Sequence, residues 1–391
     1  MVDQHRKVRA AFQESFQGTG AVVVRSPARV NLIGEHTDYN DGFVMPAAVN
    51  HAIYFAMAPN QDGHYRFVSL DLDDRYSCRL DETPLEQSGE EWPDYFLGVI
   101  DQLLQREYSI PGFDCVFGGD IPIGAGMSSS AALEGGMFAG LNAMYELQLD
   151  RLTMTKLGQK AENEFVGVQC GIMDQFANHY GRKNSVFQLD CRSLDYEYHP
   201  FAREDLRIVL CDTTVRRGLA DSEYNERRRQ CEEGVKILQQ YDRSIQALRD
   251  VSPDLLQSHR QEFEQVVYRR CEYVVRENSR VLEAGRAIET EEYRRVGELM
   301  YESHAGLRDQ YEVSCDELDF LVGLTRDMPG VYGARMMGAG FGGCTINLVQ
   351  NDAIGQLKKT VQDEYQQEFG ETPPVYVSTL TDGTEVLDGI E

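Results

Sequence analysis

The densest group of chemically active side chains lies in residues 26–39, directly after a strand-like run at residues 21–25. The side chains concerned are those of Arg29, Glu35, His36, Thr37 and Asp38. Carboxylates accept several hydroxyl groups of a sugar, and arginine offers a fixed cationic fork, so this set favours a pocket lining. A loop whose acidic residues only cap a turn is the structural alternative. His36 and Asp38 alone are too few ligands for a zinc site.

A second segment, residues 118–133, is a glycine- and serine-rich loop that runs directly into a helical sequence. Such a loop presents free backbone N–H groups and the positive end of a helix dipole, which together suit a polyphosphate. The serine hydroxyls can add hydrogen bonds or a magnesium ligand. The chain contains no Gly-Lys-Ser or Gly-Lys-Thr, so this is not a P-loop of the Walker type. A plain turn with a helix cap would need only one serine and one glycine.

A third segment, residues 333–344, satisfies Gly-x-Gly-x-x-Gly at Gly338, Gly340 and Gly343. A dinucleotide-binding fingerprint must open a helix, whereas residues 345–349 are β-branched and strand-like. We therefore reject the dinucleotide interpretation. A glycine-rich turn between two strands, close to a ligand, fits the pattern better.

The elements that must position these segments are of mixed type. Strands are expected at residues 21–25, 52–58, 66–70, 115–117, 185–189, 207–211, 331–337, 345–349 and 375–378. Helices are expected at residues 130–145, 222–241, 261–287, 291–307, 318–324 and 352–368, with Ser314 and Glu317 as a capping box before the fifth. This pattern predicts an α/β or α+β protein whose two domains join near residues 190–210.

The overall composition narrows the classes of function. A chain of 391 residues should form two domains, because single cores stop growing near ~250–300 residues. The net charge of −26 argues against a nucleic-acid partner, and a site for an anionic ligand must supply its own positive charge. No apolar run is long enough for a membrane span, and the first residues lack a signal-peptide core, so a cytoplasmic protein is expected. The nine cysteines form no Cys-x-x-Cys pair, which favours buried free thiols.

Taken together, the three segments resemble those of the galactokinases, a branch of the GHMP small-molecule kinases. Residues 29–39 look like the motif specific to galactokinases, whereas the other two segments look like motifs of the wider superfamily. Residues 171–176 and 222–228 match further parts of the family pattern. Ala28 and Met127 depart from the residues common in the family, but neither is a proposed chemical group.

The resemblance implies a role for each matching position. Asp174 is the base for the anomeric hydroxyl, either removing its proton or orienting it, and Arg29 stabilises nearby charge. The expected sugar-binding residues are Glu35, His36, Thr37, Asp38 and Tyr224. The expected ATP-binding residues are Gly124, Ala125, Gly126, Met127, Ser128, Ser129 and Ser130, with Ser69 as the weakest assignment. Ser130 and Glu162 are the expected Mg²⁺ ligands.

The resemblance also implies the fold and the reaction. We expect two α/β domains, residues 1–200 and 201–391, with the active site between them. The expected reaction is ATP- and Mg²⁺-dependent phosphorylation of galactose at C1 by a monomer that binds neither nucleic acid nor membranes. N-acetylgalactosamine as the substrate, or a galactose- and ATP-binding sensor without catalysis, are the alternatives. Intact Ser128–Ala132, Arg29 and Asp174 weigh against the sensor.

Overall fold

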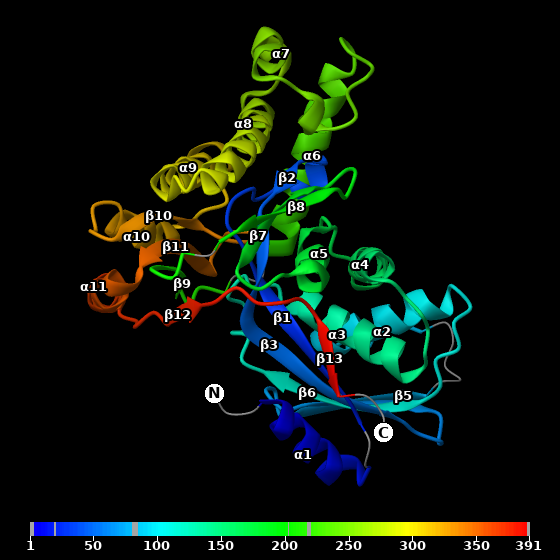
Figure 1. Ribbon diagram of the computed structural model, residues 1–391. Helices are drawn as coiled ribbons and strands as arrows, with labels where there is room; N and C mark the ends of the chain where they lie inside the picture. The colour runs from blue at the N-terminus through cyan, green and yellow to red at the C-terminus, as the bar shows by residue number, and fades with distance from the viewer. Residues whose placement is uncertain (1–3, 19–20, 80–84, 202, 217–219, 389–391) are drawn as a thin grey trace.

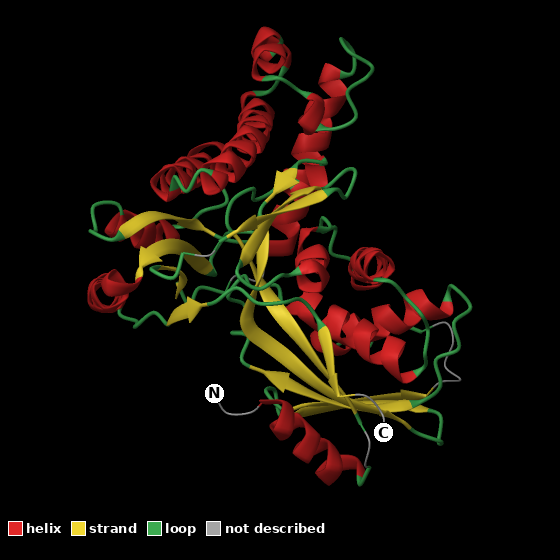
Figure 2. Cartoon of the chain, viewed as in Figure 1, coloured by secondary structure: helices red, strands yellow, loops and turns green. Residues whose placement is uncertain are grey.

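The computed structural model describes residues 4–18, 21–79, 85–201, 203–216 and 220–388 (Figure 1). Helices and strands alternate in layers, and the mixed α/β class expected from the sequence is confirmed (Figure 2). Within these residues, no helix combines the length and the apolar character that crossing a membrane requires.

The largest sheet has the strand order β13-β1-β3-β6-β4-β5. Its strands are β1 (Val22–Asn31), β3 (Pro46–Pro59), β4 (His64–Ser69), β5 (Asp74–Arg79), β6 (Phe113–Gly119) and β13 (Glu385–Asp388). All neighbours are antiparallel except β4 and β6. β1 is buried at every position because both faces of the sheet are covered.

Helices of the first half of the chain cover this sheet (Figure 1). α1 (Gln4–Phe16) packs on one face, against β3 and β6. The helices on the other side are α2 (Glu91–Leu104), α3 (Ser129–Met144), α4 (Arg151–Lys160) and α5 (Met173–Tyr180), with a π-helical turn at Ala161–Val166. Apolar side chains of α2, α3 and α4 pack with those of the sheet in one core, which fixes the position of α3, whereas α5 packs in a separate cluster with β2 (Phe43–Val44) and β7 (Ser185–Asp190).

The second large sheet has the order β10-β11-β9-β12, and all of its neighbours are antiparallel. Its strands are β9 (Leu206–Asp212), β10 (Val331–Met336), β11 (Cys344–Gln350) and β12 (Val375–Ser378). The helices α9 (Tyr293–Gly306), α10 (Asp316–Thr325) and α11 (Ile354–Phe369) pack against it or against one another. The turn between β10 and β11 holds the third glycine segment.

A small sheet and a helical layer complete the chain. The small sheet joins β2 (Phe43–Val44), β7 (Ser185–Asp190) and β8 (Tyr196–Pro200). The helices α6 (Ala220–Leu238), α7 (Pro253–Ser258) and α8 (Gln265–Glu289) stand beside it, at the top of Figure 1. α8 contacts β2, β7, β8 and α9, so it links this sheet to the second large sheet.

The strands and helices expected from the sequence are confirmed, and most of their boundaries lie within a few residues of the expected places. β1 and β3 are longer than expected, since β1 continues to Asn31 and β3 begins at Pro46, so Arg29 lies on a strand and not after it. The capping box at Ser314 and Glu317 is wrong. α10 begins at Asp316 after Cys315, which takes the N-cap position, and the Ser314 hydroxyl donates to Asp319 instead (2.6 Å). Because Ser314 lies one residue too early, its side chain does not reach the N–H group that it was expected to cap.

β10 is held in place by an unusually close approach of helix to strand. Gly297 of α9 lies against Gly333 of β10, and a Cβ atom at Gly297 would overlap the backbone carbonyl of Tyr332 and lie 2.8 Å from the nitrogen of Gly333. The two glycines therefore set the position of the strand that leads to the turn at Gly338.

We expect Gly297→Ala to lower the free energy of unfolding by roughly 2 kcal/mol or more, because the methyl group has no space and must push β10 away. Gly323→Ala is the matched control, since Gly323 lies in α10 with no atom close to an added Cβ. That change should stabilise the protein by up to ~1 kcal/mol through helix propensity. Urea unfolding of both variants measures the difference, and equal effects would contradict this account.

Candidate active site

A cavity of about 570 Å³ lies where three segments meet. They are residues 26–39, called here the sugar-motif loop, residues 118–130, called the glycine-serine loop, and the β10–β11 turn. The predicted residues that line it are Arg29, Glu35, His36, Asp38, Gly124, Ala125, Gly126, Met127, Ser128, Ser129, Ser130, Glu162, Asp174 and Tyr224. Thr37 and Ser69 are not among its lining residues. The lining also includes residues 337–343 and Arg216, so elements of both large sheets contribute to it.

Arg29 and Asp174 form a bidentate pair in this cavity. Arg29 donates from Nε to Oδ1 (2.7 Å) and from Nη2 to Oδ2 (3.0 Å), and its Nη1 donates to the carbonyl oxygen of Gly126 (2.5 Å). Burial disfavours the charged guanidinium, but the Asp174 carboxylate outweighs it, so the pKa of Arg29 is raised. The Ser128 hydroxyl donates to Oδ2 of Asp174 as well (2.5 Å). Asp174 is therefore held by the last residue of the loop and by β1.

Asp174 owes its position to α5, which begins at Met173. Its side chain stays 25% exposed, whereas the Arg29 side chain is only 5% exposed. The carboxylate thus faces the cavity while the arginine stands behind it. A buried cation behind a cavity-facing anion is an arrangement that can orient a hydroxyl and balance the charge that develops on it.

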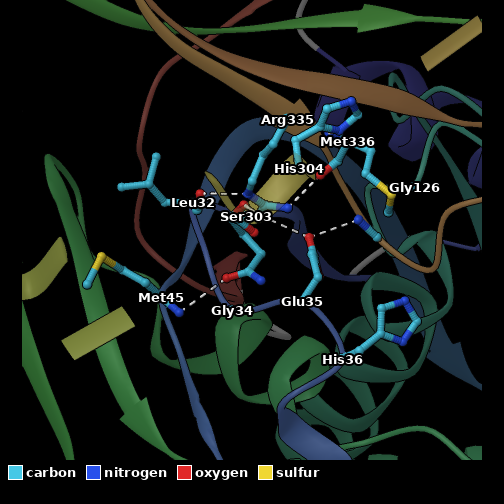
Figure 3. Close-up of polar contacts among 12 residues, drawn as sticks. Leu32, Gly34, Glu35, His36, Met45, Gly126, Ser303, His304, Arg335 and Met336 are labelled. Atoms are coloured by element: carbon cyan, nitrogen blue, oxygen red, sulfur yellow. Dashed lines mark hydrogen bonds and ion pairs between the residues drawn. The ribbon is translucent and has the colours of Figure 1, made fainter. Parts of the chain in front are cut away.

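Glu35 is fixed by groups that sequence reasoning did not identify. Its Oε1 accepts from Nη2 of Arg335 (3.1 Å) and from the N–H of Gly338 (2.9 Å), as Figure 3 shows for the ion pair. Arg335 is fully buried and also donates to the carbonyl oxygens of Leu32 (2.9 Å) and Asn31. An arginine within the apolar strand-like run 331–337 was the available signal, because a charge there must have buried partners.

His36 contributes a neutral ring to the cavity. Its Nε2 lies 3.1 Å from the carbonyl oxygen of Ala339, and its Nδ1 lies 2.8 Å from the hydroxyl of Tyr39. Burial lowers the pKa of His36 to about 3, with smaller contributions from the charges of Arg227 and Arg335. The ring also packs near Tyr224, with 5.4 Å between the ring centroids.

Thr37 and Asp38 are neighbours in sequence with different surroundings. The Thr37 hydroxyl faces the backbone carbonyls of Gly34 (2.8 Å) and Phe43 (2.6 Å), so it stabilises the loop from within. Asp38 packs closely on Gly171, where a Cβ atom would overlap its carboxylate. Burial, and then the charge of Asp174, raise the pKa of Asp38 to about 7.

The glycine-serine loop takes conformations that favour glycine. Gly124 (φ 69°), Gly126 (φ 72°) and Ser128 (φ 56°) all have left-handed backbone, and α3 begins directly afterwards at Ser129. The Ser128 side chain makes no capping hydrogen bond, since it turns to Asp174. The first N–H groups of α3 thus have no capping side chain at Ser128, and such groups can receive phosphate oxygens.

Arg216 brings a second cation to this loop. Its Nε donates to the carbonyl oxygen of Ile123 (3.0 Å), its guanidinium pairs with Asp212 (2.8 Å), and its side chain lies where a Cβ of Gly124 would be. Sequence reasoning missed Arg216, because nothing in the pattern around residues 212–216 indicates that β9 ends beside the loop.

A group of buried acidic and amide side chains lies next to Ser130. Gln175 donates to Glu162 (2.7 Å) and to Glu134 (3.1 Å). Burial, and then the charge of Asp174, raise the pKa of Glu162 to about 7, and burial raises that of Glu134 well above its ordinary value. Within the described part of the chain, Oε1 of Glu134 and Oε1 of Gln175 have no hydrogen-bond partner.

Ser69 lies at the end of β4, away from the cavity lining. Its side chain is buried, and its hydroxyl oxygen accepts from the N–H of Leu72 (3.3 Å), which shapes the turn after the strand. The nucleotide contact expected at Ser69 stays a prediction, as do the other assigned roles.

Family models and relatives of known function match this chain over nearly its whole length, and they indicate one family. Residues 10–59 match the galactokinase galactose-binding signature, residues 94–182 the GHMP kinases N terminal domain, and residues 286–367 the GHMP kinases C terminal domain. A galactokinase from Roseiflexus sp. (strain RS-1) is 41% identical over 98% of this chain and 97% of its own length. A galactokinase from Bacillus subtilis (strain 168) is 41% identical over 93% of this chain and 94% of its own.

Solved structures give the same result. The crystal structure of Lactococcus lactis galactokinase complexed with galactose superposes with a TM-score of 0.94 at 36% identity, covering 98% of this chain and 99% of the other. A mevalonate kinase superposes with a TM-score of 0.65 at 18% identity, over 92% of this chain and 99% of its own, which shows a shared fold.

We expect the stability difference between Asp38→Asn and wild type to depend on pH. The pKa of Asp38 is higher in the folded protein, so the wild type loses stability as pH rises from about 4 to about 7, whereas asparagine does not titrate. The advantage of Asp38→Asn in unfolding free energy should therefore grow by roughly 1–3 kcal/mol over this window and level off above it. Urea unfolding of the ligand-free protein across the pH series measures it.

The matched control is Asp352→Asn, at an exposed position remote from the cavity. Its difference from wild type should stay nearly constant with pH. A constant difference for Asp38→Asn as well would mean that Asp38 is solvated as an ordinary surface carboxylate is.

Proposed function

The chain belongs to the galactokinases, the branch of the GHMP kinases that phosphorylates galactose with ATP, and we propose that Asp174 and Arg29 carry the transfer to the C1 hydroxyl. The observation that supports these roles is the bidentate pair itself. It lies between the loop that suits a polyphosphate and the loop that suits a sugar, with its carboxylate facing the cavity.

The C1 hydroxyl of galactose donates to the Asp174 carboxylate in the bound complex. As its oxygen forms a bond to the γ-phosphorus, the bond from phosphorus to the β–γ bridging oxygen breaks and ADP leaves. The hydroxyl proton passes to Asp174 and later to solvent. Arg29 stays paired throughout and stabilises the negative charge that shifts between the oxygens. Positioning supplies the larger part of the rate, because phosphoryl transfer needs little covalent help.

The phosphates of ATP bind at the start of α3. Residues 124–130 line the same cavity as Asp174, and α3 begins among them at Ser129, so the positive end of its dipole lies at this cavity. Arg216 adds a positive charge beside Gly124. These groups supply the local positive charge that a protein of net charge −26 needs in order to bind an anionic nucleotide.

Galactose binds between Asp174 and the turn after β10. Glu35 and Asp38 accept sugar hydroxyls, because both are cavity-lining carboxylates held by neighbouring protein groups. Tyr224 closes this side, where its ring packs edge-on to Tyr39 with 5.1 Å between the centroids. A sugar with a displaced hydroxyl would leave one of these acceptors unpaired, which supports selectivity for galactose.

The residues next to Ser130 fit a magnesium ion. Mg²⁺ prefers oxygen ligands, and burial together with the nearby charge of Asp174 raises the pKa of Glu162, so a cation would stabilise its charged form. The partnerless oxygens of Glu134 and Gln175 are consistent with a further cationic group there. Ser130 and Glu162 would hold the ion, which when bound neutralises charge on the phosphates of ATP. The monomeric state, the cytoplasmic location and the domain limits 1–200 and 201–391 stay predictions.

Asp174→Asn keeps the shape of the side chain but removes its charge. We expect binding of galactose and ATP to change only a few-fold, while kcat falls by roughly 10²–10⁴, the usual worth of a general base. Arg29→Ala should also lower kcat more than sugar affinity. Calorimetric titration together with an ADP-release assay on galactose measures both quantities.

Asp38→Ala is the control, because loss of a sugar-binding carboxylate should raise KM strongly. If Asp174→Asn keeps more than about a tenth of the wild-type kcat, Asp174 has a structural role and the assignment of the base is wrong.

We expect activity to disappear on chelation of divalent cations and to return with added Mg²⁺. Glu162→Gln should raise the Mg²⁺ concentration needed for half-maximal rate by roughly tenfold or more, since a charged ligand is lost. Glu164→Gln is the control, because Glu164 lies two residues along the same π-helical turn and pairs with Lys160 (3.8 Å) on the surface. Equal Mg²⁺ requirements in the two variants would contradict the site.

A further inference from the structure

A chain of hydrogen-bonding side chains runs away from the sugar-motif loop behind His36. The hydroxyl of Tyr39 lies 2.8 Å from Nδ1 of His36, and 2.7 Å from the hydroxyl of Tyr311. The Tyr311 hydroxyl in turn lies 3.2 Å from Sγ of Cys231 on α6. Tyr311 and Cys231 are almost completely buried, so these contacts are not shared with bulk water. On the other side of the ring, Nε2 meets the carbonyl oxygen of Ala339.

The chemistry of the two ends fixes the direction of every hydrogen bond. A backbone carbonyl only accepts, so Nε2 of His36 must carry the proton that reaches Ala339. In a neutral imidazole Nδ1 is then an acceptor, and the Tyr39 hydroxyl must donate to it. Tyr39 oxygen therefore accepts from Tyr311, and Tyr311 oxygen accepts from the thiol of Cys231.

The imidazole ring of His36 is neutral because its buried surroundings disfavour the positive charge that a second proton would bring. His36 is only 4% exposed, and the cationic side chains of Arg227 and Arg335 act on it from two other elements. Both ring nitrogens are thus committed to protein groups, and neither keeps a proton or a lone pair for a ligand.

We propose that Cys231, Tyr311 and Tyr39 form a one-way relay that holds His36 as the Nε2–H tautomer, and that His36 is a positioning residue for the turn at Ala339. The ring nitrogens then bind no sugar hydroxyl, although His36 lies in the motif that binds galactose. This inference rests on the proposed function, because it assigns one residue of the same site.

The position of Ala339 explains what the relay is for. Oε1 of Glu35 accepts from the N–H of Gly338, and Nε2 of His36 donates to the carbonyl oxygen of the next residue, so two consecutive loop residues bind two consecutive residues of the turn. His36 takes a left-handed backbone (φ 62°), which a residue other than glycine adopts at a cost that these contacts offset. Arg335 also donates to Oε1 of Glu35 and so fixes that carboxylate further. The relay thus keeps the sugar-motif loop and the turn at Ala339 in one arrangement relative to each other.

The first experiment measures the tautomer of His36 by two-bond ¹H–¹⁵N NMR at pH 7, with His36→Gln used to assign its resonances. We expect the Nε2–H pattern in the ligand-free enzyme and unchanged with galactose bound. In Tyr39→Phe, which removes the donor, the Nδ1 resonance should shift. Tyr65→Phe is the control, because it removes a buried tyrosine hydroxyl on β4 that donates to the carbonyl oxygen of Ile110 (2.8 Å). An Nδ1–H pattern, or an identical shift in both variants, would overturn the relay.

The second experiment measures kcat/KM of the wild type and of His36→Gln with galactose and with its 2-, 3-, 4- and 6-deoxy analogues. Glutamine keeps an N–H near the place of Nε2. If His36 binds no hydroxyl through its ring, the fold-loss in kcat/KM caused by the substitution should be the same for every sugar, within about threefold. A larger coupling at any one hydroxyl overturns the proposal. Glu35→Gln in the same panel is the positive control and should couple to one hydroxyl.

If His36→Gln does not fold, His36→Asn replaces it in assigning the resonances, and Tyr39→Phe goes through the same panel of sugars with the same expectation. The two proposals are tested by different results. Failure of the wild-type enzyme to phosphorylate galactose would contradict the proposed function, whereas the NMR pattern of His36 tests the relay whether or not the enzyme is active.

Discussion

The buried ion pair between Arg335 and Glu35 is the interaction on which the site depends. A fully buried guanidinium is tolerated only when its donors are paired, and Arg335 finds its acceptors in Asn31, Leu32, Met336 and Glu35. Three of these belong to the sugar-motif segment and one to β10. The loop and the strand therefore reach their native positions together or not at all. The bond from Gly338 to Glu35 follows from that placement, and so does the orientation of the carboxylate.

The parts of the site that could be predicted from the sequence are contiguous segments. The carboxylates of residues 35–38 and the glycines and serines of residues 124–130 display their chemistry within a few positions, the first group after a strand and the second directly before a helix. The mixed α/β class was predictable for the same reason, since period and turn residues are local properties. Asp174 was identified through the family pattern around it, and the structure places it against Arg29, 145 positions away.

The residues that sequence reasoning missed depend on contacts between distant elements. Arg335, Arg216 and Tyr311 act on the site only because β10, β9 and the turn at Leu307–Tyr311 end beside it. Within the same motif, Thr37 turns into its own loop while Asp38 faces the cavity, a difference that their adjacent positions in the sequence do not show. Spacing along the chain predicts which residues are near one another, but backbone direction decides which side each one faces.

The pairing of β13 with β1 has a consequence for biosynthesis. Val23 is paired with Asp388, so β1 is made long before the strand that becomes its edge partner. Until then β1 has β3 on one side and an open edge on the other, during a stage when the growing chain already contains the apolar core beneath it. Contacts of such long separation close slowly, because the loop entropy is lost before the strand is gained. The nascent chain thus carries an exposed strand edge until β13 has been made, and this edge is where chaperone binding or misassembly between chains would begin.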